Sequence, residues 1–216
     1  MAGAKRSQGR ERPLGPRALR TRRRLLDATA ELLRERGLRG VSVVEIARRA
    51  RTSPASFYQY FGGVEEATLA LAEEAAAEMP EIVRLVGRPW EGQAGLANAR
   101  VLVAHFLDLW DTHHAALRTR NHAAEEGDQA FRRKTRQALR PLLEALAAKL
   151  GAGAAAGSAR EAAFHPYAAA AALATVLESA GAHHRELEYF GIDRDALIET
   201  SARLLVDTAE LSRRRA

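Results

Sequence analysis

Residues 37–61 read GLRGVSVVEIARRARTSPASFYQYF and contain two helix starts close together. Ser42 is followed three residues later by Glu45, the spacing of a capping box in which each residue satisfies a free backbone N–H of the other. Ser53 comes directly before Pro54, which is the usual pairing of an N-cap with a proline at the first helical position. The stretch therefore predicts two short helices joined by a tight turn.

A longer helix precedes this pair. Between residues 17 and 36, Leu26, Ala30 and Leu33 recur at helical spacing, and Gly37 supplies a stop. Two short helices behind a supporting helix form a helix-turn-helix, which reads DNA by placing its second helix in the major groove. An ordinary three-helix bundle with accidentally exposed tyrosines is the alternative interpretation.

The charge distribution favours DNA. Residues 1–60 carry 15 Lys and Arg against 5 Asp and Glu, whereas the remaining 156 residues carry 18 against 22. A net charge of +10 in the first part and −4 in the second indicates a polyanion partner, most simply nucleic acid, for the first part alone. A solvated basic face is the alternative, although it would spread its charge more evenly.

The second short helix presents side chains suited to base and phosphate contacts: Ala55, Ser56, Tyr58, Gln59 and Tyr60. Small residues let the helix backbone approach the base edges, while hydroxyl and amide groups form hydrogen bonds with bases or phosphates.

At these residues the chain resembles the TetR (tetracycline-repressor-like) family of bacterial transcriptional regulators. The specific pattern is Ile46-Ala47, Ala50, Ser53 and then Phe57-Tyr58-Gln59-Tyr60-Phe61. The resemblance implies that Ser42 caps its helix and touches a phosphate, and that Tyr58 and Tyr60 contact phosphates. It implies this set of DNA-binding residues: Ser42, Val44, Thr52, Ala55, Ser56, Tyr58, Gln59 and Tyr60.

Three residues depart from the family pattern. Arg51 replaces the usual turn glycine, so a non-glycine residue has to accept a positive φ. Val44 stands where many members carry an arginine that reads guanine, and it offers only apolar contact, for example to a thymine methyl group. Val64 replaces a lysine that contacts phosphate. Arginines near the N-terminus either compensate or attract DNA only weakly: Arg10, Arg12, Arg17 and Arg20.

The rest of the chain also predicts helices, near 64–79, 91–113, 115–124, 128–150, 164–188 and 193–212, because strand-type alternation is missing. The expected fold is all-α. It comprises a basic tail (1–15), a three-helix DNA-binding domain (16–63) and, by the TetR resemblance, a helical ligand-binding and dimerisation domain (64–216).

The last two expected helices carry stripes suited to dimerisation. Small residues line one face of 164–188 (Ala168, Ala171, Ala172 and Thr175), and 193–212 has leucines at heptad spacing (Leu197, Leu204 and Leu211). The same stripes also fit an intramolecular core, and periodicity does not separate the two.

A ligand pocket is expected around the helix 91–113, which has an apolar and aromatic face next to polar groups. The residues assigned to it are Leu102, His105, Phe106, Trp110, Arg120, Asn121 and Phe131. The segment 120–128 resembles a stretch in actinobacterial members of the family, some of which sense lipid-like or acyl-CoA ligands. An apolar cavity with a few polar groups is what a small molecule needs, although such a stripe also fits plain core.

Other chemistry finds no support in the sequence. The chain has no cysteine, which excludes disulfides, thiolate metal sites and cysteine nucleophiles. The glycines of 151–157 lack the preceding strand of a dinucleotide-binding motif. Histidine spacing predicts no metal site, and we expect no cofactor and no catalytic residue. No apolar run predicts a membrane helix, and the basic N-terminus has no apolar segment behind it, so we expect a cytoplasmic protein.

The sequence therefore predicts a homodimeric repressor that binds a near-palindromic operator in double-stranded DNA and is released by a small apolar or amphipathic effector. Two alternatives remain. One is a constitutive DNA-binding protein whose second domain only dimerises, and the other is an all-α carrier of a lipid or cofactor.

Overall fold

The structure, a computed structural model, describes residues 15–151 and 165–214. Within these ranges the regular elements are all helical, which confirms the all-α class. The α-helices are α1 (Pro16–Arg36), α2 (Val43–Arg49), α3 (Pro54–Tyr58), α4 (Val64–Ala76), α5 (Met79–Val86), α6 (Gly92–Glu125), α7 (Gln129–Lys149), α8 (Pro166–Leu187) and α9 (Arg194–Arg213), with 3-10 turns η1 (Leu38–Gly40) and η2 (Glu188–Phe190).

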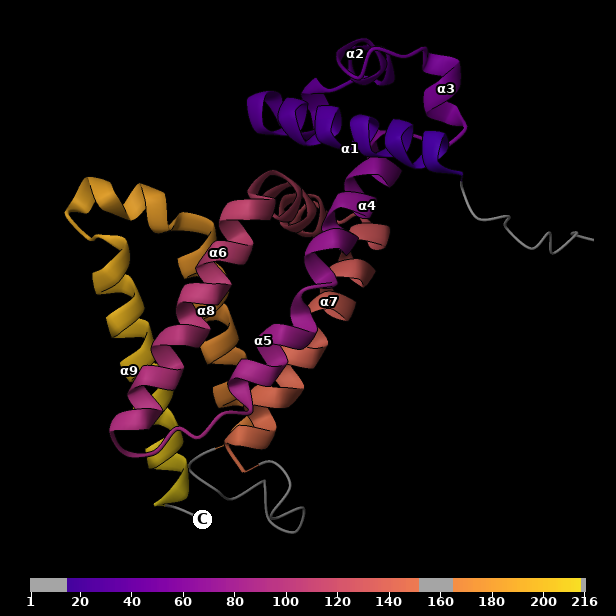
Figure 1. Ribbon diagram of the computed structural model, residues 1–216. Coiled ribbons are helices and arrows are strands. Elements are labelled where there is room, and N and C mark those ends of the chain that lie inside the picture. Colours follow the sequence, from indigo (N-terminus) through magenta and orange to yellow (C-terminus); the bar gives the residue numbers. More distant parts are fainter. Residues whose placement is uncertain (1–14, 152–164, 215–216) are drawn as a thin grey trace, which may run out of the picture.

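Helices α1–α3 form a head at one end of a body made of the remaining helices (Figure 1). Helix α4 leads from the head into the body, where α5 packs against α7 and α8 packs against α9. Helix α6 runs through the middle and contacts α1, α4, α7, α8 and α9. Of the basic tail (1–15) the structure describes only Gly15, so Arg10 and Arg12 lie outside the described residues.

The local signals of the head act as predicted. The Ser42 side chain accepts a hydrogen bond from the Glu45 backbone N–H (3.3 Å), and the Ser42 N–H donates to the Glu45 carboxylate (3.2 Å). Ser53 caps α3 by accepting from the Ser56 N–H (3.1 Å). Arg51, in the turn between α2 and α3, has φ 54°, the positive value expected where a glycine is usual.

Two hydrophobic cores share two helices. The core of the head is built on Leu25, Leu26, Ile46, Phe57 and Phe61 and also takes in the first half of α4 and Ala115 and Ala116 of α6. The core of the body begins on α4 at Ala75 and includes residues from all of α5–α9. Helices α4 and α6 each contribute residues to both cores and so connect the head to the body.

Helix α5 was not predicted. The sequence pattern places a helix at 64–79 and a break at Pro80, whereas α4 ends at Ala76 and α5 starts at Met79. Pro80 therefore lies in the first turn of a new helix, where its missing N–H leaves no hydrogen bond unmade.

The boundary predicted between helices at 91–113 and 115–124 coincides with a kink inside the long helix α6. His113 interrupts it with non-helical angles (φ −110°, ψ 15°). The ring of His113 contacts the Glu78 carboxylate (Nε2–Oε1 2.7 Å), which lies at the junction of α4 and α5. The kink in α6 at His113 and the junction of α4 and α5 at Glu78 are thus joined by a polar contact. No helix in the described part of the chain is long and apolar enough to cross a membrane.

Candidate DNA-binding surface and ligand cavity

Helix α3 is anchored by one aromatic side chain and turns the others outward. Phe57 is completely buried, and its ring packs edge-to-face against the ring of Tyr58 (5.7 Å between ring centroids). Tyr58 itself is 60% exposed. Ala55 and Gln59 are also exposed, while Tyr60 is half-buried. The burial of Phe57 therefore sets the rotation of α3 that presents Ala55, Tyr58 and Gln59 to solvent.

Helix α2 is oriented in the same way. Ile46 and Ala47 are fully buried, whereas Ser42 is exposed and Val44 is 63% exposed. A valine so exposed contributes little to stability, because its methyl groups remain in water. Thr52, in the turn, is half-buried and its N–H donates to the Ala47 carbonyl (2.9 Å).

Ion pairs hold α2 against α1 and neutralise part of the basic charge. Arg49 contacts Glu31 (3.0 Å) and Glu35 (3.1 Å), and Arg36 contacts Glu45 (2.5 Å). Hydrogen bonds from Ser42 and Arg36 lower the pKa of Glu45 below its usual range. Arg36 and Arg49 therefore form ion pairs within the head.

Other arginines remain for an external anion. Arg48 and Arg51 are exposed and form no ion pair with any described residue. Arg17 and Arg20 are exposed on the first turns of α1, the end of that helix beside which α3 lies (Figure 1). Arg22 from the same helix lies over the Phe61 ring (5.3 Å). Exposed arginines thus lie on α2, in the turn before α3 and on the first turns of α1, where they are available for phosphate contacts.

A cavity of about 550 Å³ lies between α4, α5 and α7. Its wall is mainly apolar: Leu69, Ala72, Ala76, Met79, Pro80, Val83, Ala138 and Pro141. Its polar members are Glu73, Lys134, Gln137 and Arg120 of α6. Lys134 and Glu73 pair with each other (2.5 Å) and both are substantially exposed, whereas the Arg120 side chain is only 4% exposed.

Arg120 belongs to a buried polar chain between α6 and α8. Its guanidinium donates two hydrogen bonds to the Asn121 side-chain oxygen (3.0 and 2.8 Å), and the Asn121 amide donates to the Glu178 carboxylate (3.3 Å). Burial lowers the pKa of Arg120 and raises the pKa of Glu178, in each case against the attraction of the other group. Removal from water thus disfavours both charges at this site.

A second hollow, of about 1030 Å³, lies where α1 and η1 face α6 and α8. Trp110 and Asn121 contribute to its lining, together with side chains of both charge signs such as Arg34, Arg118 and Glu65. Its mixed and largely charged wall is less suited to an apolar molecule than the cavity described above.

Two family models match the chain. The model for bacterial regulatory proteins of the tetR family matches residues 25–70, and that for the tetracyclin repressor-like C-terminal domain matches residues 82–208, more than half of the chain. The chain belongs to the TetR family. It is therefore a transcriptional regulator with the helix-turn-helix of that family in its head.

Individual relatives are more distant. An HTH-type transcriptional regulator of Haemophilus influenzae is 27% identical over 129 residues, which are 59% of this chain and 62% of that protein, so the match spans less than two thirds of the relative.

Solved structures share the fold. A TetR-like regulator from Rhodococcus sp. RHA1 is 22% identical (TM-score 0.64; 89% of this chain and 96% of that one), and FadR from Bacillus subtilis in complex with stearoyl-CoA is 17% identical (TM-score 0.64; 86% and 98%).

The residues predicted for a ligand site do not come together at one cavity in this TetR protein. Arg120 lines the cavity between α4, α5 and α7, whereas Trp110 and Asn121 line the second hollow. Leu102, Phe106 and Phe131 are buried and line neither, and His105 is half-buried. Most of the cavity wall, on α4 and α5, was missed. The helical spacing of the apolar residues within 79–86 is the sequence signal that would have pointed to this part of the wall.

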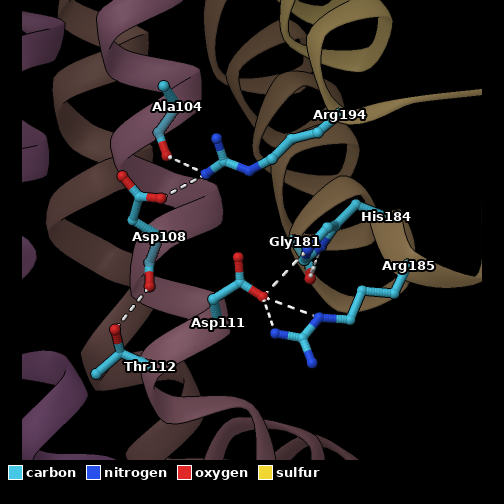
Figure 2. A network of polar contacts seen from close by, with 8 residues as sticks. All are labelled: Ala104, Asp108, Asp111, Thr112, Gly181, His184, Arg185 and Arg194. Carbon is cyan, nitrogen blue, oxygen red and sulfur yellow. Dashed lines mark hydrogen bonds and ion pairs between the residues drawn. The ribbon is translucent and has the colours of Figure 1, made fainter.

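A polar network joins α6 to α8 and α9 (Figure 2). Arg194 reaches Asp108 (2.5 Å) and the Ala104 carbonyl (3.3 Å), and Asp111 contacts Arg185 and the ring of His184 (3.2 Å). Burial raises the pKa of Asp111, but Arg185 and His184 outweigh it and the net shift is downward. The network links the last two helices to α6 in addition to the buried apolar contacts of the body core.

Helices α8 and α9 also expose an apolar face. The small residues Ala168, Ala171, Ala172 and Thr175 are exposed on α8, next to Val176. On α9, Leu204 is 46% and Leu211 44% exposed, whereas Leu197 is half-buried. Two of the three leucines at heptad spacing therefore lie outside the core of the single chain.

Within residues 15–151 and 165–214, no group of three or more His, Asp or Glu side chains is arranged to hold a metal ion.

Proposed function

We propose that this TetR-family regulator is a ligand-responsive, cytoplasmic repressor that binds a near-palindromic operator as a homodimer. The observation that carries the proposal is the sharing of α4 and α6 between the two cores. These helices connect an exposed, cation-rich α2–α3 surface to a body that contains an apolar cavity of about 550 Å³.

The exposed face of α8 and α9 supports the dimer. A monomer would leave Leu204, Leu211 and Val176 in water beside a run of small residues. Pairing two copies through this face allows close helix contact and buries apolar surface. Burial of apolar surface is favourable by about 25 cal/mol per Å². A two-fold dimer would carry two α3 helices for two half-sites about one DNA turn, roughly 34 Å, apart.

The cavity supports control by a small molecule. Leu69, Ala72 and Ala76 of α4 line it, and the same helix supplies Val64 and Leu71 to the core of the head. An effector that fits the cavity better in one position of α4 would favour that position and so change the spacing of the two α3 helices. The apolar wall suits an apolar or amphipathic, lipid-like effector, and a TetR-fold neighbour is known in complex with stearoyl-CoA.

The test of DNA recognition begins with selection of binding sites from randomised duplexes, which we expect to enrich an inverted repeat. Affinity for the selected operator and for a scrambled duplex is then measured by fluorescence anisotropy. Tyr58→Phe is expected to weaken binding to both duplexes alike, since it removes a phosphate contact. Gln59→Ala is expected to weaken operator binding by about 10-fold or more and to leave the scrambled duplex nearly unchanged.

Affinity for both duplexes is also expected to fall steeply with salt, because phosphate contacts release counterions. A flat salt dependence, or an equal effect of Gln59→Ala on the two duplexes, would contradict this proposal for α2 and α3.

A further inference from the structure

We propose that the cavity between α4, α5 and α7 takes an amphipathic anion, an aliphatic carboxylate whose head group binds Arg120. The inference rests on the proposed function only in using the same cavity, and it specifies the charge of the ligand.

The guanidinium of Arg120 is buried without a carboxylate in hydrogen-bond contact. Arginine carries five N–H donors. Two of its nitrogens, Nε and one terminal nitrogen, donate to the single Asn121 oxygen, and the Glu178 carboxylate lies 3.8 Å from the nearest guanidinium nitrogen. The other terminal nitrogen forms no hydrogen bond with the described residues. A buried cation so sparsely paired gains more from an added anion than an exposed arginine does.

Glu178 lies near this cation but makes no hydrogen bond with it, since its carboxylate is 3.8 Å from the nearest guanidinium nitrogen. Burial raises the pKa of the Glu178 carboxyl group above its ordinary value, against the lowering effect of Arg120 and Asn121. At the rim, Lys134 and Glu73 pair with each other and their charges cancel. The charge that the cavity wall leaves for a ligand is therefore the positive charge of Arg120, with the Gln137 amide as a further hydrogen-bonding group.

The remainder of the wall fits an alkyl chain. Leucine, methionine, valine, alanine and proline side chains form most of it, at Leu69, Ala72, Ala76, Met79, Pro80, Val83, Ala138 and Pro141. The volume of about 550 Å³ is within the range of roughly 300–1,000 Å³ typical of small-molecule sites. One buried cation in an otherwise apolar cavity matches a molecule with one anionic end and a hydrocarbon body.

Glu178 and the ligand then compete for the same guanidinium. A carboxylate bound to Arg120 makes the short charged hydrogen bonds that Glu178, at 3.8 Å, does not make. Removing the charge of Glu178 is expected to strengthen ligand binding, whereas removing the charge of Arg120 is expected to weaken it. Damage to the cavity would weaken binding in both variants, so the opposite signs separate the two explanations.

The experiment titrates full-length protein by calorimetry with dodecanoate, dodecanol and dodecylammonium, each below its micelle concentration. The three probes share a chain and differ in head-group charge. Wild-type protein is expected to bind dodecanoate most tightly and dodecylammonium least. Arg120→Gln is expected to weaken dodecanoate binding by about 10- to 100-fold, the value of a charged hydrogen bond, with little change for dodecanol. Glu178→Gln is expected to strengthen dodecanoate binding several-fold.

Two further variants serve as controls. Arg120→Gln leaves the Glu178 carboxylate buried without its cationic neighbour. The double variant Arg120→Gln/Glu178→Gln removes both charges while keeping side-chain size. It is expected to fold and to bind dodecanoate and dodecanol with similar affinity. Arg133→Gln removes an exposed positive charge of α7 that does not line the cavity, and it is expected to bind as wild type.

Failure to bind dodecanoate, equal affinity for dodecanoate and dodecylammonium, or unchanged dodecanoate affinity in Arg120→Gln would each overturn the inference. Release from the selected operator is measured separately by anisotropy. Dodecanoate binding with the expected variant pattern but without release of DNA would uphold the ligand class and contradict the proposed ligand response.

Discussion

At the scale of single residues, the structure shows where this chain pays an energetic cost in the head. Arg51 holds φ 54° in the turn between α2 and α3, a conformation that is unfavourable for a residue with a Cβ atom by about 1–2 kcal/mol. The side chain is exposed and has no ion-pair partner in the described part of the chain. Backbone hydrogen bonds from the N–H groups of Arg51 (3.1 Å to the Arg48 carbonyl) and Thr52 (2.9 Å to the Ala47 carbonyl) hold this turn, and the charged side chain remains available for a contact with DNA.

Arg51→Gly is accordingly expected to raise the free energy of unfolding by about 1 kcal/mol, because glycine accepts this φ without strain. It is also expected to weaken binding to any duplex, since a cation next to α3 is lost. Urea unfolding and anisotropy measure the two effects. Arg51→Asn is the matched control: asparagine tolerates the conformation and lacks the charge, so it should behave similarly. Lower stability in both variants would contradict the interpretation.

Glu178 is expected to make stability depend on pH. Burial raises the pKa of its carboxyl group, so the folded protein keeps a proton that the unfolded chain has released. Wherever the folded state binds more protons, stability falls as pH rises. Between the ordinary glutamate range, near about 4.3, and the raised folded pKa, the wild type is therefore expected to lose stability that Glu178→Gln does not lose.

Urea unfolding of wild type, Glu178→Gln and Glu45→Gln from about pH 2.5 to pH 8 measures this difference, a range that extends below the ordinary glutamate pKa. Glu45→Gln is a control of opposite sign, because hydrogen bonds from Ser42 and Arg36 lower the pKa of Glu45. The stability contributed by Glu45 is present above the ordinary glutamate pKa and is lost as pH falls through the lowered one. Identical pH slopes for wild type and Glu178→Gln would exclude a raised pKa at Glu178.

At the scale of helices, the sequence predicted the elements whose signals are local. The Ser42–Glu45 capping box and the Ser53–Pro54 pair act within four residues, and both function in the structure as expected. Pro80 was ambiguous because a proline marks either a break or the first turn of a new helix. The residues Met79, Ile82, Leu85 and Val86 recur at helical spacing around it, and α5 packs against α6 and α7.

The candidate ligand site was less predictable because it arises from packing between distant segments. The cavity wall combines α4, α5 and α7, which no local periodicity relates to one another. Phe106 and Trp110 share an apolar stripe that fits either a core or a pocket, and Phe106 lies in the core of the body without lining a cavity. Arg120 was among the predicted residues, and it lines the cavity.

The close approach of α6 and α8 depends on Gly181. A Cβ atom at this position would lie 2.2 Å from a ring carbon of Trp110, which is buried and surrounded by core. Gly181→Ala is therefore expected to force the helices apart and to lower the free energy of unfolding by about 1–3 kcal/mol, despite the better helix propensity of alanine. Ser179→Ala, at an exposed position of α8, is the control and should change stability by less than about 0.5 kcal/mol. Equal stability of Gly181→Ala and wild type in urea would contradict this packing argument.

At the scale of the whole molecule, the head and the body are coupled through α4 and α6, and the body offers the surface through which two heads are brought into register. The contacts from α6 to Arg185 of α8 and Arg194 of α9 hold these two helices in place (Figure 2). They leave the opposite, apolar face of the pair exposed in the single chain. A rigid pair of helices with one free apolar face is suited to symmetric association, because each copy presents the same surface to the other.

Leu204→Glu tests this association without disturbing the single chain. Leu204 is 46% exposed, so a glutamate there remains solvated in the monomer, whereas in the proposed dimer it becomes a buried charge without a partner, at a cost of about 3–5 kcal/mol. We expect wild type to sediment as a dimer at micromolar concentration, and Leu204→Glu to sediment as a folded monomer with wild-type circular dichroism. Its operator affinity is expected to fall to that for a scrambled duplex, because a single half-site offers too few contacts. Ala148→Glu, at an exposed position of α7, adds the same charge outside α8 and α9 and should remain dimeric. A wild-type monomer, or a dimeric Leu204→Glu variant, would show that the face of α8 and α9 does not hold the dimer.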